Sequence, residues 1–273
     1  MRTSFNISNK MTMIAEMRND TIFQILEYDE LGENIDPKIS MKLDYIRKSN
    51  NKLRQARIIL DNSEIKIEPG KLSYYKGEIN IESKNNFVGI GKRLISNIMM
   101  KETNLKPVIE GSGEVFLEAA FENFVLLELE DEEIIIDSKA FCACENSIEI
   151  ESLRELKDPY LEEYSNKLKL VGSGIALITI PVSHKEILKC KIYRDSIKIN
   201  GDMVLLRSGS IEHEIEKLSN NLLGDSSEGK FLNIYNGTGE LWLAPTLKVY
   251  EILREKIEED MIEYLRDIEN IQN

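Results

Sequence analysis

The chain repeats one pattern three times, in the stretches SEIKIEPGKLSYYKGEINIE (63–82), EEIIIDSKAFCACENSIEIE (132–151) and DSIKINGDMVLLRSGSIEHE (195–214), which align without a gap. Isoleucine recurs at three equivalent positions, and a glutamate closes each stretch. The equivalent isoleucines are Ile65, Ile134 and Ile197, then Ile67, Ile136 and Ile199, then Ile79, Ile148 and Ile211. The first two of each stretch are two residues apart, which places them on one face of a strand. Turn-forming residues follow, so each stretch predicts a small antiparallel meander with buried isoleucines.

A second repeated element is a Gly-x-Gly triplet that leads into a strand-like stretch. It occurs at Gly111-Ser112-Gly113, at Gly172-Ser173-Gly174 and at Gly237-Thr238-Gly239. A phosphate-binding loop should open a helix, whereas these triplets open strands, so we interpret them as turns or bulges. The first meander has no such strand before it, and the last such strand has no meander after it. We therefore predict circular closure, in which the strand Leu241–Pro245 pairs with the N-terminal module.

Other segments carry weaker patterns. Strands are predicted at Thr21–Leu26, at the alternating residues Met41, Leu43 and Tyr45, and at Ala56–Leu60. Residues 90–100 and 152–165 look locally helical, as short elements that cross over or cover the strands.

The last segment, 247–273, predicts an amphipathic helix appended to a β domain of residues 1–246. Its apolar residues recur at spacings of three and four, which places them on one side of a helix. These residues are Val249, Leu253, Ile257, Met261, Leu265 and Ile268. We expect the β domain to hold Val249 and Leu253. We favour docking of the last three on the same chain over packing against a partner chain.

The charge and composition exclude several classes of protein. There are 35 Lys and Arg residues against 48 Asp and Glu residues, a formal net charge of −13. An acidic surface repels phosphate backbones, so we expect no specific nucleic-acid binding. No apolar run reaches the roughly 18 residues of a membrane helix, and the first 20 residues are too polar for a secretory signal. Three cysteines and no sign of secretion predict a reduced, cytoplasmic protein.

Few residues offer reactive chemistry. His184 and His213 are the two imidazoles of the chain, and neither has ligands at metal-binding spacing around it. Cys142 and Cys144 share one face of a strand, but their acidic surroundings do not favour thiolates, and we interpret them as strand filling. The acidic run Glu128–Glu133 is interpreted as a solvated turn rather than a calcium or acid–base site. We predict no catalytic residue, no metal and no cofactor.

Two further features bear on partners. Trp242 is either part of the core or the mark of an interface. The segment Gly91–Met100 combines two cations with an apolar cluster, and we favour a core-covering helix there over contact with a membrane or a partner.

The stretch that begins GSGEVFLEAA (111–120), the GSGIALITIPV stretch (172–182) and the ending NGTGELWLAPT (236–246) resemble a bacterial protein family of unknown function. That family is related to the "altered inheritance of mitochondria" proteins, and the resemblance covers about residues 12–246. It implies a mainly β fold like that of the tryptophan RNA-binding attenuation protein (TRAP), built as a single-chain pseudo-trimer of antiparallel β modules. It carries over no catalytic residue. The basic residues and tryptophan pocket of that RNA-binding protein have no counterpart here.

The sequence therefore favours a non-catalytic scaffold or interaction protein with a protein partner. The alternative is a module that binds a small ligand or nucleic acid in grooves between its repeats. Peripheral membrane contact and the oligomeric state stay open.

Overall fold

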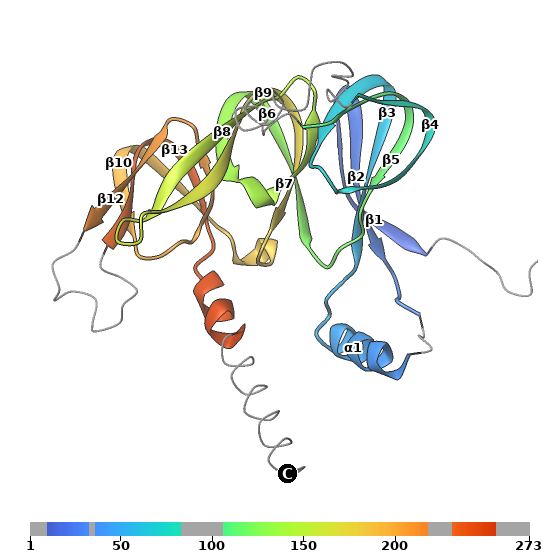
Figure 1. The fold of residues 1–273 in the computed structure, drawn as a ribbon, viewed down its shortest axis with the longest axis horizontal. Helices are drawn as coiled ribbons and strands as arrows, with labels where there is room; N and C mark the ends of the chain where they lie inside the picture. Colours follow the sequence, from blue (N-terminus) through green and yellow to red (C-terminus); the bar gives the residue numbers. More distant parts are fainter. Residues whose placement is uncertain (1–9, 33–35, 83–105, 218–230, 255–273) are drawn as a thin grey trace, which may run out of the picture. The chain divides into compact units, whose positions relative to one another are not determined.

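The computed structural model describes residues 10–32, 36–82, 106–217 and 231–254 (Figure 1). The chain forms two compact units. The first comprises Met1–Lys157 and Tyr164–Ile180, and the second comprises Asp158–Glu163 and Pro181–Asn273. Antiparallel strands dominate both units, which confirms the predicted fold class.

The first unit begins with an antiparallel sheet of β1 (Met11–Arg18), β2 (Thr21–Tyr28) and β3 (Arg54–Ile67). The strands predicted at Thr21–Leu26 and Ala56–Leu60 are confirmed as parts of β2 and β3. Both strands bury apolar side chains, including Phe23 and Ile58, which are fully buried.

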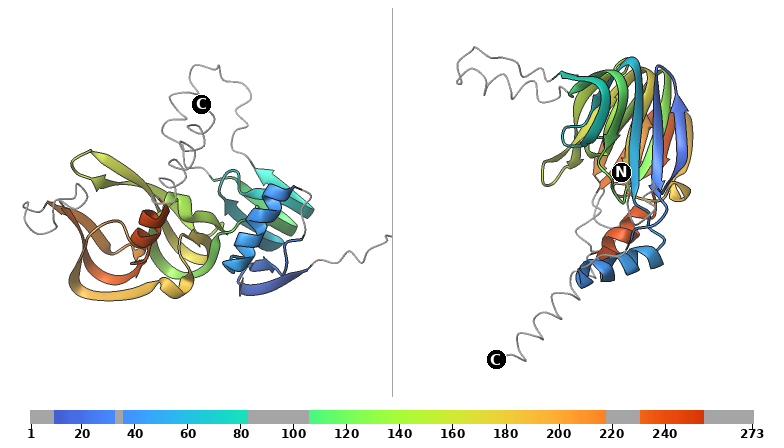
Figure 2. Two further views of the ribbon diagram at one scale, coloured as in Figure 1. Left: turned by 90° about the horizontal axis from the view of Figure 1, so that it is seen from below. Right: turned by 90° about the vertical axis from the view of Figure 1, so that its right-hand side faces the viewer.

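The helix α1 (Pro37–Lys48) joins β2 to β3, so the strand predicted around Met41, Leu43 and Tyr45 is wrong. The side chain of Asp36 accepts a hydrogen bond from the amide of Lys38 at 2.8 Å, and Pro37 occupies the first turn. An Asp cap followed by proline is a strong helix start, and it overrides the short alternation. The helix lies beyond the end of the β1–β3 sheet rather than against its face (Figures 1 and 2).

Each aligned stretch belongs to a set of strands that the chain builds three times. We call these sets repeats 1, 2 and 3. Repeat 1 consists of β3, β4 (Leu72–Glu82) and β5 (Val108–Leu117). Repeat 2 consists of β6 (Asn123–Asp137), β7 (Phe141–Glu145), β8 (Glu149–Asp158) and β9 (Glu163–Ile180), with the 3-10 turn η1 (Ser138–Ala140). Repeat 3 consists of η2 (His184–Glu186), β10 (Leu188–Ile199), β11 (Val204–Ser208), β12 (Ile211–Lys217) and β13 (Phe231–Leu243).

The pairing of strands follows the same plan in each repeat. The first long strand pairs with the last strand, as β3 with β5, β6 with β9 and β10 with β13. The strands between them also pair with that last strand. Strands are therefore confirmed in each stretch, but the predicted meanders are wrong, because the strands within one stretch pair with that last strand and not with each other. Ile65 and Ile134 are buried as expected, while Ile197 is half-buried against the core of the second unit. The rotation by a third of a turn between repeats stays a prediction.

The Gly-x-Gly triplets lie inside these last strands, opposite a β-bulge in the first long strand. The register shifts between Leu60 and Ser63, between Leu129 and Glu132, and between Tyr193 and Asp195. The bulged residues Asn62, Asp131 and Arg194 have φ values of +52°, +55° and +49°. The triplets are therefore neither turns nor the bulged residues themselves; they lie opposite the bulges, and they do not open their strands.

A hydroxyl from the middle of each triplet holds the bulge. The amide of Asn62 donates to Ser112 Oγ at 2.9 Å, and that of Asp131 donates to Ser173 Oγ at 2.8 Å. In repeat 3 the amide of Arg194 donates to Thr238 Oγ1 at 2.9 Å. We call each bulged residue with its triplet a bulge site. The three bulge sites show that the sequence repeat has a common structural basis.

The glycines of a bulge site let the neighbouring strand approach closely. A Cβ atom at Gly111 would lie 2.0 Å from the carbonyl oxygen of Glu78, and one at Gly237 would lie 2.5 Å from that of Ser210. Both glycines also have φ values above +120°, where a side chain is strained.

The predicted circular closure is wrong. β13, which contains Leu241–Leu243, pairs with β10, β11 and β12 of its own repeat. Each triplet strand belongs to the repeat that precedes it in the chain, because its hydroxyl holds the bulge in the first strand of that same repeat. The first repeat thus already has its triplet strand, β5.

Residues 152–165 form part of the β8–β9 hairpin, so the helix predicted there is wrong. The side chain of Asp158 accepts hydrogen bonds from the amides of Tyr160 and Leu161 at 2.7 and 3.0 Å. This Asp turn, with Pro159 inside it, reverses the chain where a helix would have to continue. Residues 90–100 lie outside the described residues.

Each unit has its own apolar core. In the first unit Phe23, Ile58, Ile65, Ile109 and Leu177 belong to one buried cluster. In the second unit the cluster contains Ile192, Ile199, Ile211, Tyr235, Leu241 and Leu243.

Candidate functional site

The side chains around a bulge site are charged and aromatic in repeats 1 and 3 and aliphatic in repeat 2. In repeat 1, Arg57 lies 2.6 Å from the carboxylate of Glu114 and 5.9 Å from the ring centre of Phe116. Burial raises the pKa of Glu114, but hydrogen bonds from Lys76 and Arg57 outweigh this effect and hold the pKa below its usual value. Tyr74 stacks on Phe116 with ring centres 4.4 Å apart. An ion pair and an aromatic pair therefore flank this bulge site.

Repeat 3 has the same chemistry at the equivalent positions. Lys189 lies 3.6 Å from Glu240 and 4.6 Å from the ring centre of Trp242. The indole N–H donates to Glu240 Oε1 at 2.7 Å, and the tryptophan is 8% exposed. Trp242 is therefore buried, although it lies outside the apolar cluster of the second unit. In repeat 2 the equivalent residues are Leu126, Ile175 and Leu177, all buried.

The two strand cysteines have no access to solvent. All five residues of β7 are buried, including Cys142 and Cys144. Burial raises the pKa of both thiols to about 12. A thiol reacts and binds metals as the thiolate, so neither side chain is prepared for either role at neutral pH. The structure places both cysteines as strand filling.

The histidines are separated and play structural or surface roles. His213 Nε2 lies 2.9 Å from Asn233 Oδ1, and its ring stacks on Tyr235 with ring centres 4.9 Å apart. His184 is exposed at the start of η2.

The acidic run Glu128–Glu133 is exposed apart from Leu129, but it forms no turn between strands. It lies inside β6, where Asp131 is the bulged residue. The interpretation as a turn is wrong because a bulge only inserts one extra residue into a strand, and β6 continues through it. Glu133 pairs with Lys169 at 2.8 Å. Within the part of the chain that the structure describes, no group of three or more His, Cys, Asp or Glu side chains is arranged to hold a metal ion.

A buried carboxylate that the sequence did not reveal joins three parts of the first unit. Glu145, at the end of β7, is 2% exposed. Its Oε1 accepts from the amide and the hydroxyl of Thr21 at 2.9 and 2.7 Å. Its Oε2 accepts from the side chain of Asn19 and the amide of Ile175, both at 2.9 Å. All four bonds are internal, so Glu145 positions the β1–β2 turn and is not open to a ligand.

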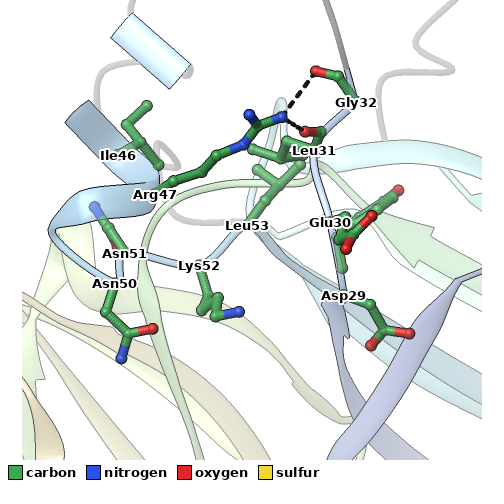
Figure 3. Close-up of a pocket in the computed structure, with 11 residues that line it drawn as sticks. Asp29, Glu30, Leu31, Gly32, Ile46, Arg47, Asn50, Asn51, Lys52 and Leu53 are labelled. Carbon is green, nitrogen blue, oxygen red and sulfur yellow. Dashed lines mark hydrogen bonds between the residues drawn. The ribbon is translucent and has the colours of Figure 1, made fainter. Parts of the chain in front are cut away.

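A hollow of about 460 Å³ lies between the end of β2 and the end of α1 (Figure 3). Arg47 on α1 donates to the carbonyl oxygens of Leu31 and Gly32, which ties the helix to the chain after β2. Lys52 lines the hollow together with Asp29 and Glu30. Since charges of both signs line it and its arginine is occupied, it selects no single class of ligand.

Both described helices expose apolar side chains. On α1, Met41 and Tyr45 are 63% and 65% exposed. The helix that starts at Leu247 follows β13 in the second unit and is described to Arg254, where Val249 and Leu253 are 54% and 49% exposed. The expectation that the β domain holds these two residues is wrong, because polar bonds to Glu186 fix the start of this helix instead. The last three residues of the stripe lie outside the described residues. No described helix is both long and apolar enough to cross a bilayer.

A family profile matches the chain over residues 46–246, and its description is "mitochondrial biogenesis AIM24". The chain belongs to this family. The resemblance seen in the sequence is thus confirmed. No curated protein matches the chain significantly.

A solved structure supports the fold of this AIM24 protein. The crystal structure of a Streptococcus pyogenes protein, determined by a structural genomics consortium, matches with a TM-score of 0.52 and 20% sequence identity. The match covers 73% of this chain and 94% of that one. At this identity the likeness concerns the fold alone.

The AIM24 match contains all three bulge sites, so the repeats are the part that this chain shares with the family. It begins inside α1 and ends at Thr246. The exposed helix of residues 247–254 therefore lies beyond the matched part of the chain.

Proposed function

We propose that this AIM24 protein is a non-catalytic scaffold of the cytoplasm that binds a protein partner through α1. Its β repeats would be the TRAP-like pseudo-trimer that the sequence resemblance implies. One observation carries the proposal, the exposed apolar pair of Met41 and Tyr45 on α1. Large apolar side chains that share one exposed helix face are typical of interaction surfaces.

More cations than anions surround the apolar pair. Residues three and four apart share one side of a helix, so three cations, Lys38, Lys42 and Lys48, and one anion, Asp44, lie on the side of Met41 and Tyr45. Lys48 pairs with Asp44 at 2.7 Å, and both side chains are largely exposed. This local excess of cations contrasts with the net charge of −13 for the whole chain. A partner segment with apolar side chains and an acidic rim would fit this face.

The polar groups of the described chain support a role without catalysis. The thiols of Cys142 and Cys144 are buried with raised pKa values. The carboxylate of Glu145 is saturated by internal donors. His213 is bonded to Asn233. A catalytic acid, base or nucleophile needs access to its substrate, which the two thiols and the carboxylate of Glu145 lack.

The test places a photo-crosslinker at Met41 in the full chain and identifies the captured protein from native extract by mass spectrometry. The purified candidate is then titrated by calorimetry against the wild type, Tyr45→Glu and Asn51→Glu. Both variants add one negative charge at an exposed site, but Asn51 lies past the end of α1. We expect Tyr45→Glu to weaken binding by about tenfold or more and Asn51→Glu to leave it unchanged.

Two results would contradict the proposal. One is equal binding by both variants, which would place the contact elsewhere. The other is tight binding of anionic vesicles or RNA that Tyr45→Glu abolishes, with no protein captured at Met41. Either ligand would then be the target of this basic face.

A further inference from the structure

A short strand joins repeat 2 to repeat 1. β7 of repeat 2 pairs antiparallel with the end of β3 in repeat 1, where Lys66 lies opposite Cys144. The amide of Glu68 donates to the carbonyl oxygen of Cys142 at 2.8 Å, and the side chain of Lys66 donates to that of Asn146 at 2.8 Å. The end of one first strand therefore binds the short strand of the following repeat. We call this pairing the repeat junction.

Repeats 3 and 1 each contain one half of a second such junction. The end of β10, residues 197–199, aligns with residues 65–67 of β3. The start of β4, residues 74–76, aligns with residues 143–145 of β7. Among the described residues, β10 pairs only with β13, and β4 pairs only with β5. Each strand therefore has a free edge, whose N–H and C=O groups can bind another strand.

The backbone of β4 matches that of β7 at the position that pairs. In β4 the register to the last strand of the repeat shifts between Leu72 and Tyr74. In β7 it shifts at the equivalent place, between Phe141 and Ala143. The two short strands thus share one irregularity, so an edge that accepts β7 also fits β4.

The side chains at the two free edges are exposed, whereas the equivalent ones at the repeat junction are covered. Cys144 is fully buried at the junction, while Tyr75, at the equivalent position of β4, is 46% exposed. Lys198 of β10 stands where β3 has Lys66, the residue that bonds across the junction. An exposed tyrosine on one open edge and this lysine on the other are suited to contact with a further strand.

Charge favours one pairing of these edges over another. If two copies of β10 paired antiparallel through residues 197–199, Lys198 would lie opposite Lys198, and like charges directly opposite destabilise a sheet. The ion pair of Lys198 with the exposed Glu216 offsets this repulsion only in part. Pairing of β10 with β4 places Lys198 opposite the uncharged Tyr75, and it reproduces the repeat junction. The occupant that fits each free edge is therefore the other edge of a second copy.

We propose that copies of this protein associate head to tail, with β10 of one copy paired antiparallel with β4 of the next. The opposite residues follow from the register of the repeat junction and are Ile197 with Lys76, Lys198 with Tyr75, and Ile199 with Tyr74. Two paired copies still have one free edge of each kind, so the association continues into a ring or a filament. The assembly does not use the partner face on α1.

Sedimentation velocity of the full chain tests the association. We expect the wild type to form species at multiples of the 31.4 kDa mass of one chain, and to form larger ones as its concentration rises. Tyr75→Lys places a like charge opposite Lys198, whereas Tyr75→Glu places an opposite charge there. The dissociation constant should therefore be about tenfold higher for the lysine variant than for the glutamate variant.

Two further sets of variants control for general effects of charge. Tyr164→Lys and Tyr164→Glu alter a tyrosine that is 50% exposed on β9, and the two should associate equally. In a Lys198→Gln background, Tyr75→Glu should lose its advantage over Tyr75→Lys. Melting temperatures show whether each variant is folded.

Disulfide cross-linking tests the direction and does not depend on charge. In a Cys190→Ser background, chains carrying both Lys198→Cys and Tyr75→Cys are oxidised and separated by mass without reductant. Head-to-tail pairing predicts a ladder of covalent multimers from this double variant, while each single variant stays mainly monomeric. The remaining cysteines, Cys142 and Cys144, are buried and do not interfere.

Four outcomes would overturn the proposal. The first is a wild type that stays monomeric at tens of micromolar. The second is equal association of folded Tyr75→Lys and Tyr75→Glu chains. The third is a disulfide within one chain of the double variant, which would show that β10 binds β4 of its own copy. The fourth is a dominant disulfide dimer of a single variant, which would show symmetric pairing of equal edges.

Discussion

Replacing Glu145 by glutamine should destabilise the first unit strongly, although the two side chains have the same shape. Glutamine keeps one oxygen, which can still accept from the amide and hydroxyl of Thr21. Its amide nitrogen then replaces Oε2, where it faces two donors, the side chain of Asn19 and the amide of Ile175. Donors cannot bond one another, so both contacts are lost.

The magnitude follows from the burial of these donors. The contact between Glu145 and the Ile175 amide is buried, and an unsatisfied buried donor costs about 1–3 kcal/mol. Asn19 is exposed and can turn to water. The bonds that remain to Thr21 lose their charge, which removes about 1 kcal/mol more. The free energy of unfolding should therefore fall by about 2–4 kcal/mol, which corresponds to a decrease in Tm of about 5–15 °C.

Thermal and urea unfolding, monitored by far-ultraviolet circular dichroism, measure this change in the free energy of unfolding. The control is Glu149→Gln, which alters an exposed glutamate at the start of the neighbouring strand β8. Trp242 lies in the second unit, so its fluorescence reports whether that unit unfolds separately. If the free energies of unfolding of Glu145→Gln and Glu149→Gln agree within about 0.5 kcal/mol, the role assigned to Glu145 is wrong.

Three further predictions follow from single contacts. Ser173→Ala removes the acceptor of a bulge amide and should lower the free energy of unfolding by about 1 kcal/mol in urea, whereas Ser73→Ala, at an exposed site, should not. In the native protein a thiol reagent should label Cys190 and spare both β7 thiols until urea unfolds the chain, and equal labelling of all three would contradict their burial. The carboxyl of Glu186, whose pKa is lowered by hydrogen bonds, should titrate below 4.5 in a carbon-13 NMR experiment, and Tyr250→Phe should move it back toward 4.5. Because that pKa is depressed on folding, the contact stabilises the helix start above pH 4.5 and is lost as the pH falls through the lowered value.

The repeats could be predicted from the sequence because their signals are local. The isoleucines recur with the two-residue period of a strand, and the turns between them contain residues such as Asn200 and Gly201. Reading local patterns failed where the periodicities of a strand and of a helix fit the same residues. Met41 and Tyr45 fit an alternating strand, but they also fit one side of a helix, and the cap at Asp36 decided between the two.

Contacts between distant residues could not be predicted. The bond between Asn62 and Ser112 joins residues 50 apart, and those of Glu145 to Thr21 join residues 124 apart. Such contacts depend on the register of strands that the sequence pattern does not define. For this reason the closure of the strands was mispredicted, and Glu145 gave no signal among the many glutamates of an acidic chain.

The three bulge sites share the same backbone features, but the side chains that flank them differ. All three have a bulged residue at positive φ, two glycines and a hydroxyl acceptor. The flanking residues change completely, from Arg57 and Glu114 in repeat 1 to Leu126 and Ile175 in repeat 2. A buried sheet face excludes charges that lack partners, so burial explains the aliphatic set of repeat 2. The faces of repeats 1 and 3 keep charged residues that reach solvent, such as Lys191, which is 82% exposed. Charged recognition at the bulge sites can therefore arise in repeats 1 and 3 by side-chain changes alone, while the shared backbone and the core stay as they are.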